Sequence, residues 1–147
     1  MGVFQPKGRW RFWAIGLGLL IIVGVAPLGI RMSEKSEFCA RCHPMLPMYR
    51  SWSHSAHARN AGCNDCHSPH DNYVKKVAFK AYTGVKDAWS MYVAGVPDSI
   101  RITSYSAGII EKNCVRCHST VVENVHSPGG KRCFDCHRFT PHLTPGI

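Results

Sequence analysis

Acidic residues are scarce in this sequence. The 147 residues contain 9 Asp and Glu against 18 Lys and Arg, so the formal net charge is +9. Such an excess can indicate nucleic acid or an anionic membrane as a partner. No basic motif interleaved with aromatic residues is present, and we therefore exclude nucleic acid. No run has the alternating pattern of a strand either, so we predict a mainly α-helical chain with much irregular structure.

No cysteine stands outside one repeated motif. Cys-x-x-Cys-His occurs at 39–43, 63–67, 114–118 and 133–137, which uses all eight cysteines. One copy could be chance, a redox pair or a zinc site, but four copies indicate c-type haem attachment, in which two thiols bind the porphyrin and the histidine reaches the iron. We predict four covalently bound haems, attached through Cys39, Cys42, Cys63, Cys66, Cys114, Cys117, Cys133 and Cys136.

The motifs form a repeat. Cys-x-Arg-Cys-His is followed by Cys-x-Asp-Cys-His, twice over, and each Asp motif is followed by Pro-His. This pattern predicts two dihaem modules joined by a longer insert. So few residues serve each haem that the haems must supply most of the buried apolar surface. Their propionates add about −8, which nearly cancels the basic excess by charge pairing.

The N-terminal part predicts a membrane anchor. Residues 1–11 are basic and contain no acid, and residues 12–30 contain no charge, close to the ~20 residues that a helix needs to cross a bilayer. The basic flank predicts that residues 1–11 stay in the cytoplasm of a bacterial cell. Residues 31–147 then form a periplasmic haem domain of a single-pass inner-membrane protein.

A cleaved signal peptide is the alternative reading of this stretch. Its apolar core would span ~7–15 residues and end at a cleavage site of small residues. This stretch is longer, and Pro27 makes Val25-Ala26-Pro27 a poor site. A buried helix of a soluble protein is a third option, disfavoured by the basic flank. Only nine residues separate Ile30 from Cys39, so the first haem should lie at or near the membrane surface.

The insert between the second and third motifs predicts a helix over residues 71–97. Apolar residues recur there at steps of three and four. Asp71 is the expected N-cap, and Gly95 with Pro97 should end the helix. A shorter helix is expected over residues 107–113, entering the third motif, and the tail after His137 should be irregular.

The remaining histidines are candidates for the sixth position of the irons. His43, His67, His118 and His137 belong to the motifs, which leaves His54, His57, His70, His126 and His142. A side chain only a few positions from a motif cannot reach the opposite face of the haem bound there, because the chain between them is too short to pass around the porphyrin. His57 and His142 should therefore serve haems other than those nearest to them in sequence.

Met45 follows His43 by two residues and cannot reach the opposite face of the first haem. It either packs against the haem or replaces His43 on the same face. Thioether ligation would raise the reduction potential relative to imidazole. The opposite face of the first haem would then be open beside the membrane.

Together the motif order, the anchor and several runs resemble the NapC/NirT family of membrane-bound tetrahaem quinol dehydrogenases. The runs are CARCHPM, SWSHSAHA, CNDCHSPHD, KAYTGVKDAW and CHRFTPH. Within that family they are most similar to the small quinol-oxidising subunit of cytochrome c nitrite reductase. The resemblance implies that menaquinol is oxidised at the first haem and that electrons pass to the periplasmic catalytic subunit, in a larger oligomer with it.

The resemblance also implies roles for individual residues. Met45 would bind the first haem in place of His43, whereas His57 and His142 would be distal ligands of the fourth and third haems. The second haem would receive a lysine from the catalytic subunit. Lys80 and Asp87 would line the quinol site, and their spacing of seven residues places them on one helix face. His126 is the next candidate for a distal ligand, and His54 and His70 rank below it.

Three other functions remain open at this stage. The chain could serve another periplasmic reductase, it could be a soluble tetrahaem carrier released by cleavage, or it could reduce a small substrate at an open haem.

The anchor predicts that the protein stays in the membrane pellet during carbonate washing and is released by detergent, because an apolar span is held by the acyl chains rather than by charge. Immunoblotting of the two fractions checks this. Release by carbonate alone would instead support the soluble carrier.

Overall fold

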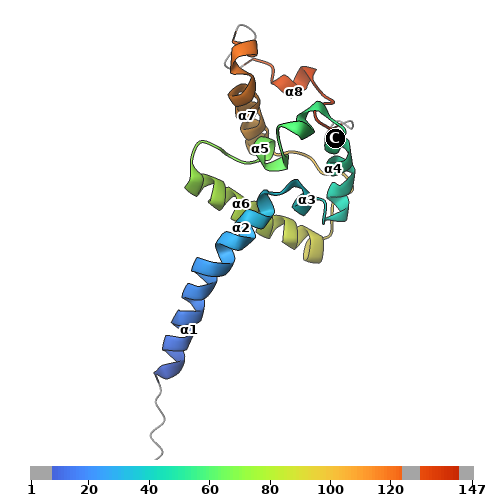
Figure 1. The fold of residues 1–147 in the computed structure, drawn as a ribbon. Helices are drawn as coiled ribbons and strands as arrows, with labels where there is room; N and C mark the ends of the chain where they lie inside the picture. Colours follow the sequence, from blue (N-terminus) through green and yellow to red (C-terminus); the bar gives the residue numbers. More distant parts are fainter. Residues whose placement is uncertain (1–7, 124–129, 143–147) are drawn as a thin grey trace, which may run out of the picture. The chain divides into compact units, whose positions relative to one another are not determined.

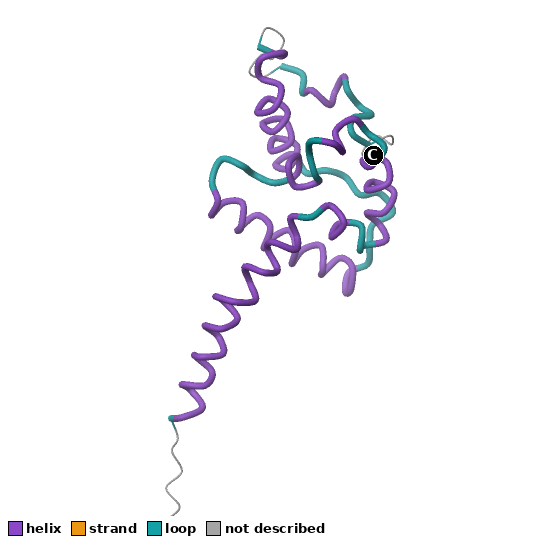
Figure 2. Tube along the Cα trace, viewed as in Figure 1, coloured by secondary structure: helices purple, strands orange, loops and turns teal. Residues whose placement is uncertain are grey.

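The computed structural model describes residues 8–123 and 130–142, and helices and loops account for all of their structure (Figure 2). The chain divides into two compact units, Met1–Ser33 and Glu34–Ile147. The predicted α-helical class is confirmed for the described residues. The proportion of helix is higher than the repeat of short motifs suggested, because several motifs lie within helices or begin them.

The first unit is an apolar helix. It comprises α1 (Arg9–Leu20), a π-helical turn (Ile21–Val25) and α2 (Ala26–Glu34), whose last residue belongs to the second unit. Pro27 has no backbone N–H to donate to the preceding turn, and the π-helical turn just before it accommodates this loss. Arg9–Glu34 measures 26 residues, or roughly 39 Å. The helix is long and apolar enough to cross a membrane, and its side chains are not buried against the protein.

The second unit is an assembly of short helices around α6 and α7 (Figure 1). In chain order these are α3 (Ser36–Cys39), a 3₁₀ turn (His43–Met45), α4 (Leu46–Ser53), a 3₁₀ turn (Ala56–Arg59), α5 (Cys63–His67), α6 (Tyr73–Trp89), a π-helical turn (Ser90–Ala94), α7 (Ser104–Val122) and α8 (Cys133–Cys136).

The two Asp motifs begin helices, and the aspartate explains why. Asp65 is the third residue of α5 and accepts a 2.8 Å hydrogen bond from the backbone N–H of Gly62. Asp135 does the same in α8, accepting from Arg132 N–H at 2.8 Å. A carboxylate at this position satisfies an N–H that the helix leaves unpaired. The Arg motifs need no such cap, because a helix already precedes each of them.

The insert forms α6, as the periodicity predicts, but the helix begins later than expected. Asn72, not Asp71, is the N-cap, and its side chain accepts from the N–H groups of Val74 and Lys75 at 2.8 and 3.2 Å. Asp71 instead forms an ion pair with Lys75 at 2.7 Å. Gly95 ends the π-helical turn with φ of +86°, a conformation that favours glycine.

The helix expected over residues 107–113 is real but is much longer. α7 begins at Ser104, where Thr103 caps it by accepting from Ser106 N–H at 3.2 Å, and it continues through the third motif to Val122. The sequence pattern missed its second half because the cysteines and histidine of the motif carry no helical signal of their own.

The second unit buries very little apolar surface. Among the described residues only Ala107 and Ile109 are buried hydrophobic residues, and no large side chain is fully enclosed. Hydrophobic burial is the main force that stabilises a folded chain. The described residues of this unit, 34–123 and 130–142, therefore lack an aliphatic core that could hold their helices together.

From this we expect the chain to depend on haem attachment for its fold. A full-length variant in which all eight cysteines are replaced by serine should keep the N-terminal helix in detergent but lose most other helical signal in circular dichroism. Limited proteolysis should then cut throughout residues 35–147, whereas the haem-loaded chain serves as the resistant control. A protease-resistant haem domain in the serine variant would contradict this expectation.

Candidate functional site

The first motif is tied to the second by the segment that precedes it. Ser36, which is buried, accepts a 3.1 Å hydrogen bond from the backbone N–H of Cys63. Asn64 donates from its side chain to the carbonyl of Glu34 at 3.3 Å. Gly62 is required at this contact, because an added Cβ would lie 2.9 Å from the Ser36 hydroxyl. The thiols of Cys39 and Cys63 are consequently hydrogen-bonding neighbours.

The second motif is tied to the third through α7. Asn113 is buried and immediately precedes the third motif. Its side-chain amide donates to the carbonyls of Cys66 and Ser68, both at 2.9 Å. Arg116, within the third motif, donates to the carbonyl of Asp65 at 3.1 Å. These bonds fix α5 against α7 at the point where both motifs lie.

The third motif is tied to the fourth by Glu111, three residues before Cys114. Its carboxylate accepts from the backbone N–H of Cys133 at 2.9 Å and from the Cys133 thiol at 3.2 Å. The thiols of Cys114 and Cys133 are also hydrogen-bonding neighbours. Each motif is thus bonded directly to the next one along the chain.

All eight cysteines are free thiols. Cys42, Cys117 and Cys136 are exposed, whereas the other five are half-buried. Burial raises the pKa of Cys66, and burial together with its cysteine and glutamate neighbours raises the pKa of Cys114 to about 12.

The structure brings two pairs of histidines together. The ring centroids of His57 and His118 are 6.1 Å apart, and those of His67 and His142 are 6.2 Å apart. In each pair one histidine belongs to a motif and the other is a candidate distal ligand. With metal–nitrogen bonds of about 2 Å, two imidazoles on opposite sides of one metal ion have a similar separation.

These neighbours differ from the ones that the sequence led us to expect. The family resemblance implied the fourth haem for His57 and the third for His142, whereas the histidines that lie beside them are His118 of the third motif and His67 of the second. Chain distance excluded only the nearest motif for each histidine, so it could not select among the other haems. That selection depends on how α5 and α7 pack.

His142 is oriented as a metal-binding histidine would be. Its Nδ1 lies 3.2 Å from the Met48 carbonyl, and because a carbonyl only accepts, Nδ1 carries the proton and Nε2 keeps its lone pair. Burial lowers the pKa of His142, and the bond to Met48 offsets part of that effect. Burial also lowers the pKa of His67 to about 4, with a smaller contribution from His142.

The His67 side chain is nevertheless accessible to solvent. Nearby protein atoms disfavour the charged form of the ring, although part of the side chain still meets solvent. Both histidines are therefore neutral at neutral pH, the form that binds a metal.

The other candidate histidines are placed less favourably for binding an iron. His70 uses its Nε2 to contact the Asn64 carbonyl at 3.2 Å, and His54 is exposed and donates from Nδ1 to the Arg50 carbonyl at 2.8 Å. The next candidate, His126, lies outside the described residues.

At the first motif, His43 is exposed whereas Met45 is half-buried. Both lie in the 3₁₀ turn that follows the motif cysteines. The thioether is therefore the more enclosed of the two possible ligands.

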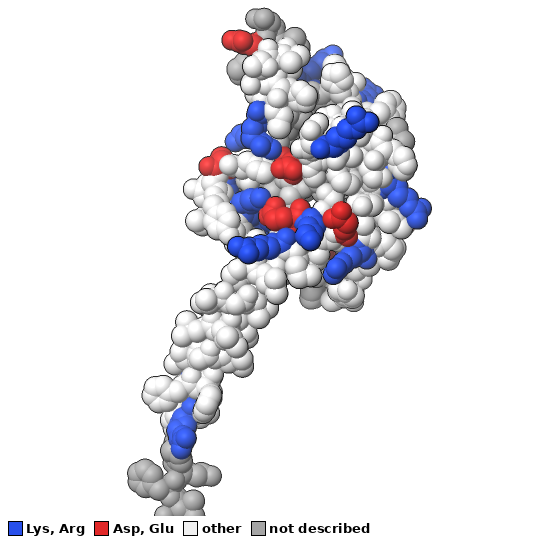
Figure 3. Space-filling view, in the orientation of Figure 1, with Lys and Arg blue, Asp and Glu red and all other residues white. Residues whose placement is uncertain are grey.

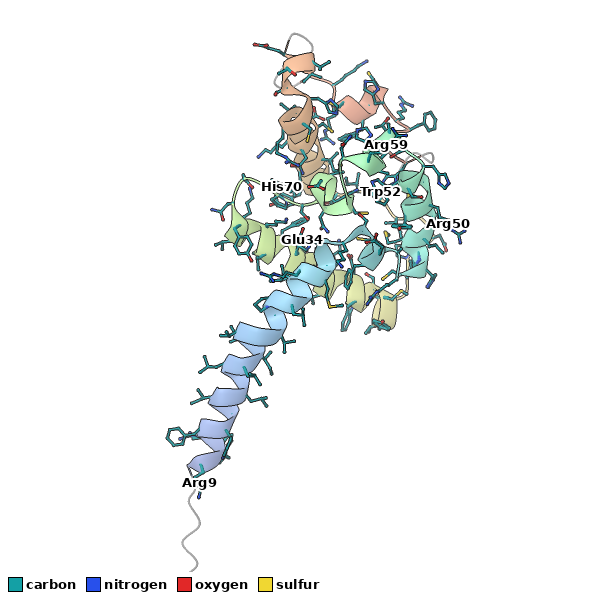
Figure 4. All side chains as sticks on the ribbon, in the orientation of Figure 1. Arg9, Glu34, Arg50, Trp52, Arg59 and His70 are labelled. Atoms are coloured by element: carbon teal, nitrogen blue, oxygen red, sulfur yellow. The ribbon has the colours of Figure 1, made fainter. Side chains whose placement is uncertain are left out.

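One face of α6 is turned toward the first motif. Lys76 and Lys80 form ion pairs with Glu34 at 3.0 and 2.9 Å, and the positive charge of Lys80 acts on the Cys39 thiol. Figure 4 labels Glu34 at the end of α2, beside α6. Basic and acidic side chains lie next to one another on this face (Figure 3).

Asp87 lies seven residues, or two turns, beyond Lys80 on α6. Burial raises the pKa of Asp87, and the charge of Lys86 offsets part of that shift. Its side chain is still accessible to solvent. Asp87 is therefore a partly enclosed carboxylate that can still exchange protons with water.

The residues fit covalently bound haem. Thiols of neighbouring motifs lie close together, the candidate histidines are paired in space, and the described helices bury few apolar side chains of their own. Haem would be held by the paired cysteines of each motif and by nearby histidine or methionine. An apolar N-terminal helix followed by a small helical unit with four linked attachment motifs defines a small multihaem c-type cytochrome.

Comparison with known proteins identifies the family. Residues 10–104 match the model of the NapC/NirT cytochrome c family, N-terminal region. The chain is 35% identical to the cytochrome c-type protein NrfH of Wolinella succinogenes, over 88% of this chain and 81% of that protein. It is also 35% identical to the cytochrome c nitrite reductase subunit NrfH of Nitratidesulfovibrio vulgaris, over 86% and 79%.

A solved structure agrees with these sequence matches. A chain from the crystal structure of the cytochrome c nitrite reductase NrfHA complex bound to the inhibitor HQNO superposes with a TM-score of 0.73. It is 32% identical and covers 91% of this chain and 90% of that one. The chain belongs to the NapC/NirT cytochrome c family, which confirms the predicted family and fold class and an electron-transfer role.

Sequence reasoning missed the residues that join the motifs. Glu34, Ser36, Glu111 and Asn113 carry no motif, and their partners are 22 to 47 residues away in the chain. Only Glu34 had a visible signal, since it is the first acidic residue after the apolar stretch.

Proposed function

We propose that this protein is a membrane-anchored tetrahaem quinol dehydrogenase. It oxidises menaquinol at the first haem and passes the electrons to a periplasmic reductase, for which the catalytic subunit of cytochrome c nitrite reductase is the best candidate. The observation that carries the proposal is the α6 face, where Lys80 and Asp87 share one side of a helix next to the first motif. The N-terminal helix would hold this face at the membrane, with the haem unit in the periplasm.

The chain's own residues account for the proton chemistry. Oxidation of a quinol releases two protons with two electrons, and the haems, when bound, supply the one-electron acceptors. Asp87 can accept a proton from a quinol hydroxyl, because burial raises its pKa above the ordinary value and its side chain is still accessible to solvent. Lys80, held in place by Glu34, offers a donor that can orient a quinol oxygen.

The contacts between the motifs support electron transfer from one haem to the next. Because hydrogen bonds from buried or half-buried groups join the region of each motif to the next, neighbouring haems would be held close together. Electrons that arrive at the first motif, which follows the anchor in the sequence, would then leave from a later one toward the partner.

The partner is inferred from the relatives. The two NrfH proteins are 35% identical to this chain, and the solved relative is part of a nitrite reductase complex. Another periplasmic reductase is the second candidate, because the same family also includes cytochromes named NapC and TorC. Assembly into a larger oligomer with the catalytic subunit belongs to the same proposal.

The proposed ligand set is Met45, His67, His118 and His137, with His57 and His142 as distal ligands. His142→Ala should convert one haem from low-spin to high-spin, because an axial nitrogen is lost. Electron paramagnetic resonance of the oxidised, purified protein measures this change. His70→Ala is a matched control, since both histidines follow a proline just after an Asp motif, and it should leave the spectrum unchanged.

The same spectra decide between two candidates for the sixth ligand of the second haem: His142, whose ring lies 6.2 Å from that of His67, and the partner lysine that the resemblance implies. If the partner supplies that ligand, a high-spin haem of the isolated wild-type chain becomes low-spin when the complex forms. A fully low-spin isolated chain would remove the need for a partner lysine. Equal spectra for wild type and His142→Ala would exclude His142 as a ligand.

Asp87→Asn should lower the rate of haem reduction by a menaquinol analogue by about 10² or more, the usual contribution of a general base. In the wild type the rate should fall as the pH decreases through the pKa of Asp87, because the protonated carboxyl cannot accept a proton. That pKa lies above the ordinary value of about 3.9. Stopped-flow absorbance of the haems gives the rate, and HQNO should block it.

Asp98→Asn, on the loop after α6, is the control for the loss of one negative charge. Its haems should be reduced by the menaquinol analogue at the wild-type rate. Reduction by dithionite should be the same in all variants, which shows that the haems are intact. A wild-type rate for Asp87→Asn would remove Asp87 from the mechanism. Turnover of nitrite by the purified protein alone would favour the terminal reductase instead.

A further inference from the structure

The side chain of Asn113 bonds to the backbone on both sides of His67. Its amide donates to the carbonyl of Cys66 and to the carbonyl of Ser68, both at 2.9 Å. Cys66 and Ser68 are the residues immediately before and after His67 in the chain. One buried amide therefore holds the backbone at the point from which the His67 ring extends.

The end of α5 explains why the backbone needs this contact. The helix ends at His67, and Ser68 is already extended, with φ of −115° and ψ of 149°. The last carbonyls of a helix have no partner within the helix and must be satisfied from elsewhere. Asn113 supplies both hydrogens of its amide to this end of α5. Because Ser68 is 2% exposed, little water can take the place of Asn113 there.

Ser68 is also fixed from within the second motif. Its hydroxyl donates to the side-chain oxygen of Asn64 at 2.9 Å, and its backbone N–H donates to the Asn64 carbonyl at 3.0 Å. The segment after His67 is thus tied to α5 as well as to Asn113. A displacement of Asn113 would therefore pass to the backbone of His67, since the residue that follows it is not free to absorb the movement.

Asn113 belongs to the helix that carries the third motif. It lies one residue before Cys114, and α7 continues without a break through His118. The backbone of His67 and the residues that would bind the third haem are therefore separated by the length of one side chain. A helix is a rigid connection, so the position of Asn113 is set by the same element that positions the third motif.

We propose that Asn113 is a positioning residue for His67, so that the helix of the third haem sets the orientation of an iron ligand of the second haem. The proposal rests on iron binding by His67, as stated under the proposed function, and requires neither quinol nor a partner. Residues around a ligating histidine fix its orientation and thereby tune the metal. The orientation of an axial imidazole affects the g values of the iron, so the effect is visible by electron paramagnetic resonance.

Asn113→Leu tests the proposal in full-length, haem-loaded protein, because leucine has a similar shape but no donor. The haem content, measured as pyridine haemochromogen, should equal that of the wild type. Electron paramagnetic resonance of the oxidised protein should show shifted g values for one haem. Asn60→Leu is the matched control, since it makes the same exchange at an exposed position three residues before the second motif. It should leave every signal unchanged.

The signal that shifts should not be that of the third haem, although Asn113 is next to the third motif in sequence. His57→Ala identifies the signal of the third haem, because the His57 ring lies beside that of His118. This signal should keep its g values in Asn113→Leu. A shift confined to it would show that Asn113 acts only on its own motif and would overturn the proposal. Wild-type g values for all haems would overturn it as well.

A measurement on the wild type does not depend on how the variant folds. In nuclear magnetic resonance, the side-chain amide hydrogens of Asn113 should exchange with D₂O at least tenfold more slowly than those of exposed Asn60, because they are bonded and buried. Equal exchange rates would contradict the proposal. A wild-type chain with fewer than four haems would instead contradict the proposed function, so the two failures are distinguishable.

Discussion

The hydrogen bonds that join each haem-attachment motif to the next are the contacts on which the rest of this structure depends. Ser36, Asn113 and Glu111 each reach from one motif to a backbone group of a neighbouring one. A backbone contact fixes position more firmly than a contact between two mobile side chains. With so few buried hydrophobic residues, these bonds and the haems themselves would set the spacing of the four sites.

The helix α6 presents three sides with different contacts. Its polar face forms ion pairs with Glu34, its flank contacts α7, and its third side is apolar and exposed. One helix therefore combines the groups proposed to handle protons with an exposed apolar side. Quinol is an apolar molecule that releases protons on oxidation, so its site needs both properties within a few residues.

Much of the architecture could be inferred from the sequence, because it depends on covalent chemistry or on local sequence pattern. The cysteine motifs identify haem attachment by their spacing, the uncharged stretch identifies a helix long enough to cross a membrane, and the periodicity of residues 71–97 identifies α6. The Asp motifs were visible as a repeat, but their physical role as helix caps became clear only when Asp65 and Asp135 were seen to accept from the residue before each helix.

The tertiary structure decided what depends on contacts between distant residues. The neighbours of His57 and His142 could not be selected from chain distance, because several motifs lie within reach of each and only the packing of α5, α7 and the C-terminal segment separates them. The roles of Glu34, Ser36, Glu111 and Asn113 depend on partners far away in the chain, and no local pattern encodes such partners. The sequence by itself determined the cofactor chemistry and the helical class, since both follow from residue type and spacing. How the four motifs are joined, and which histidine meets which, required the fold.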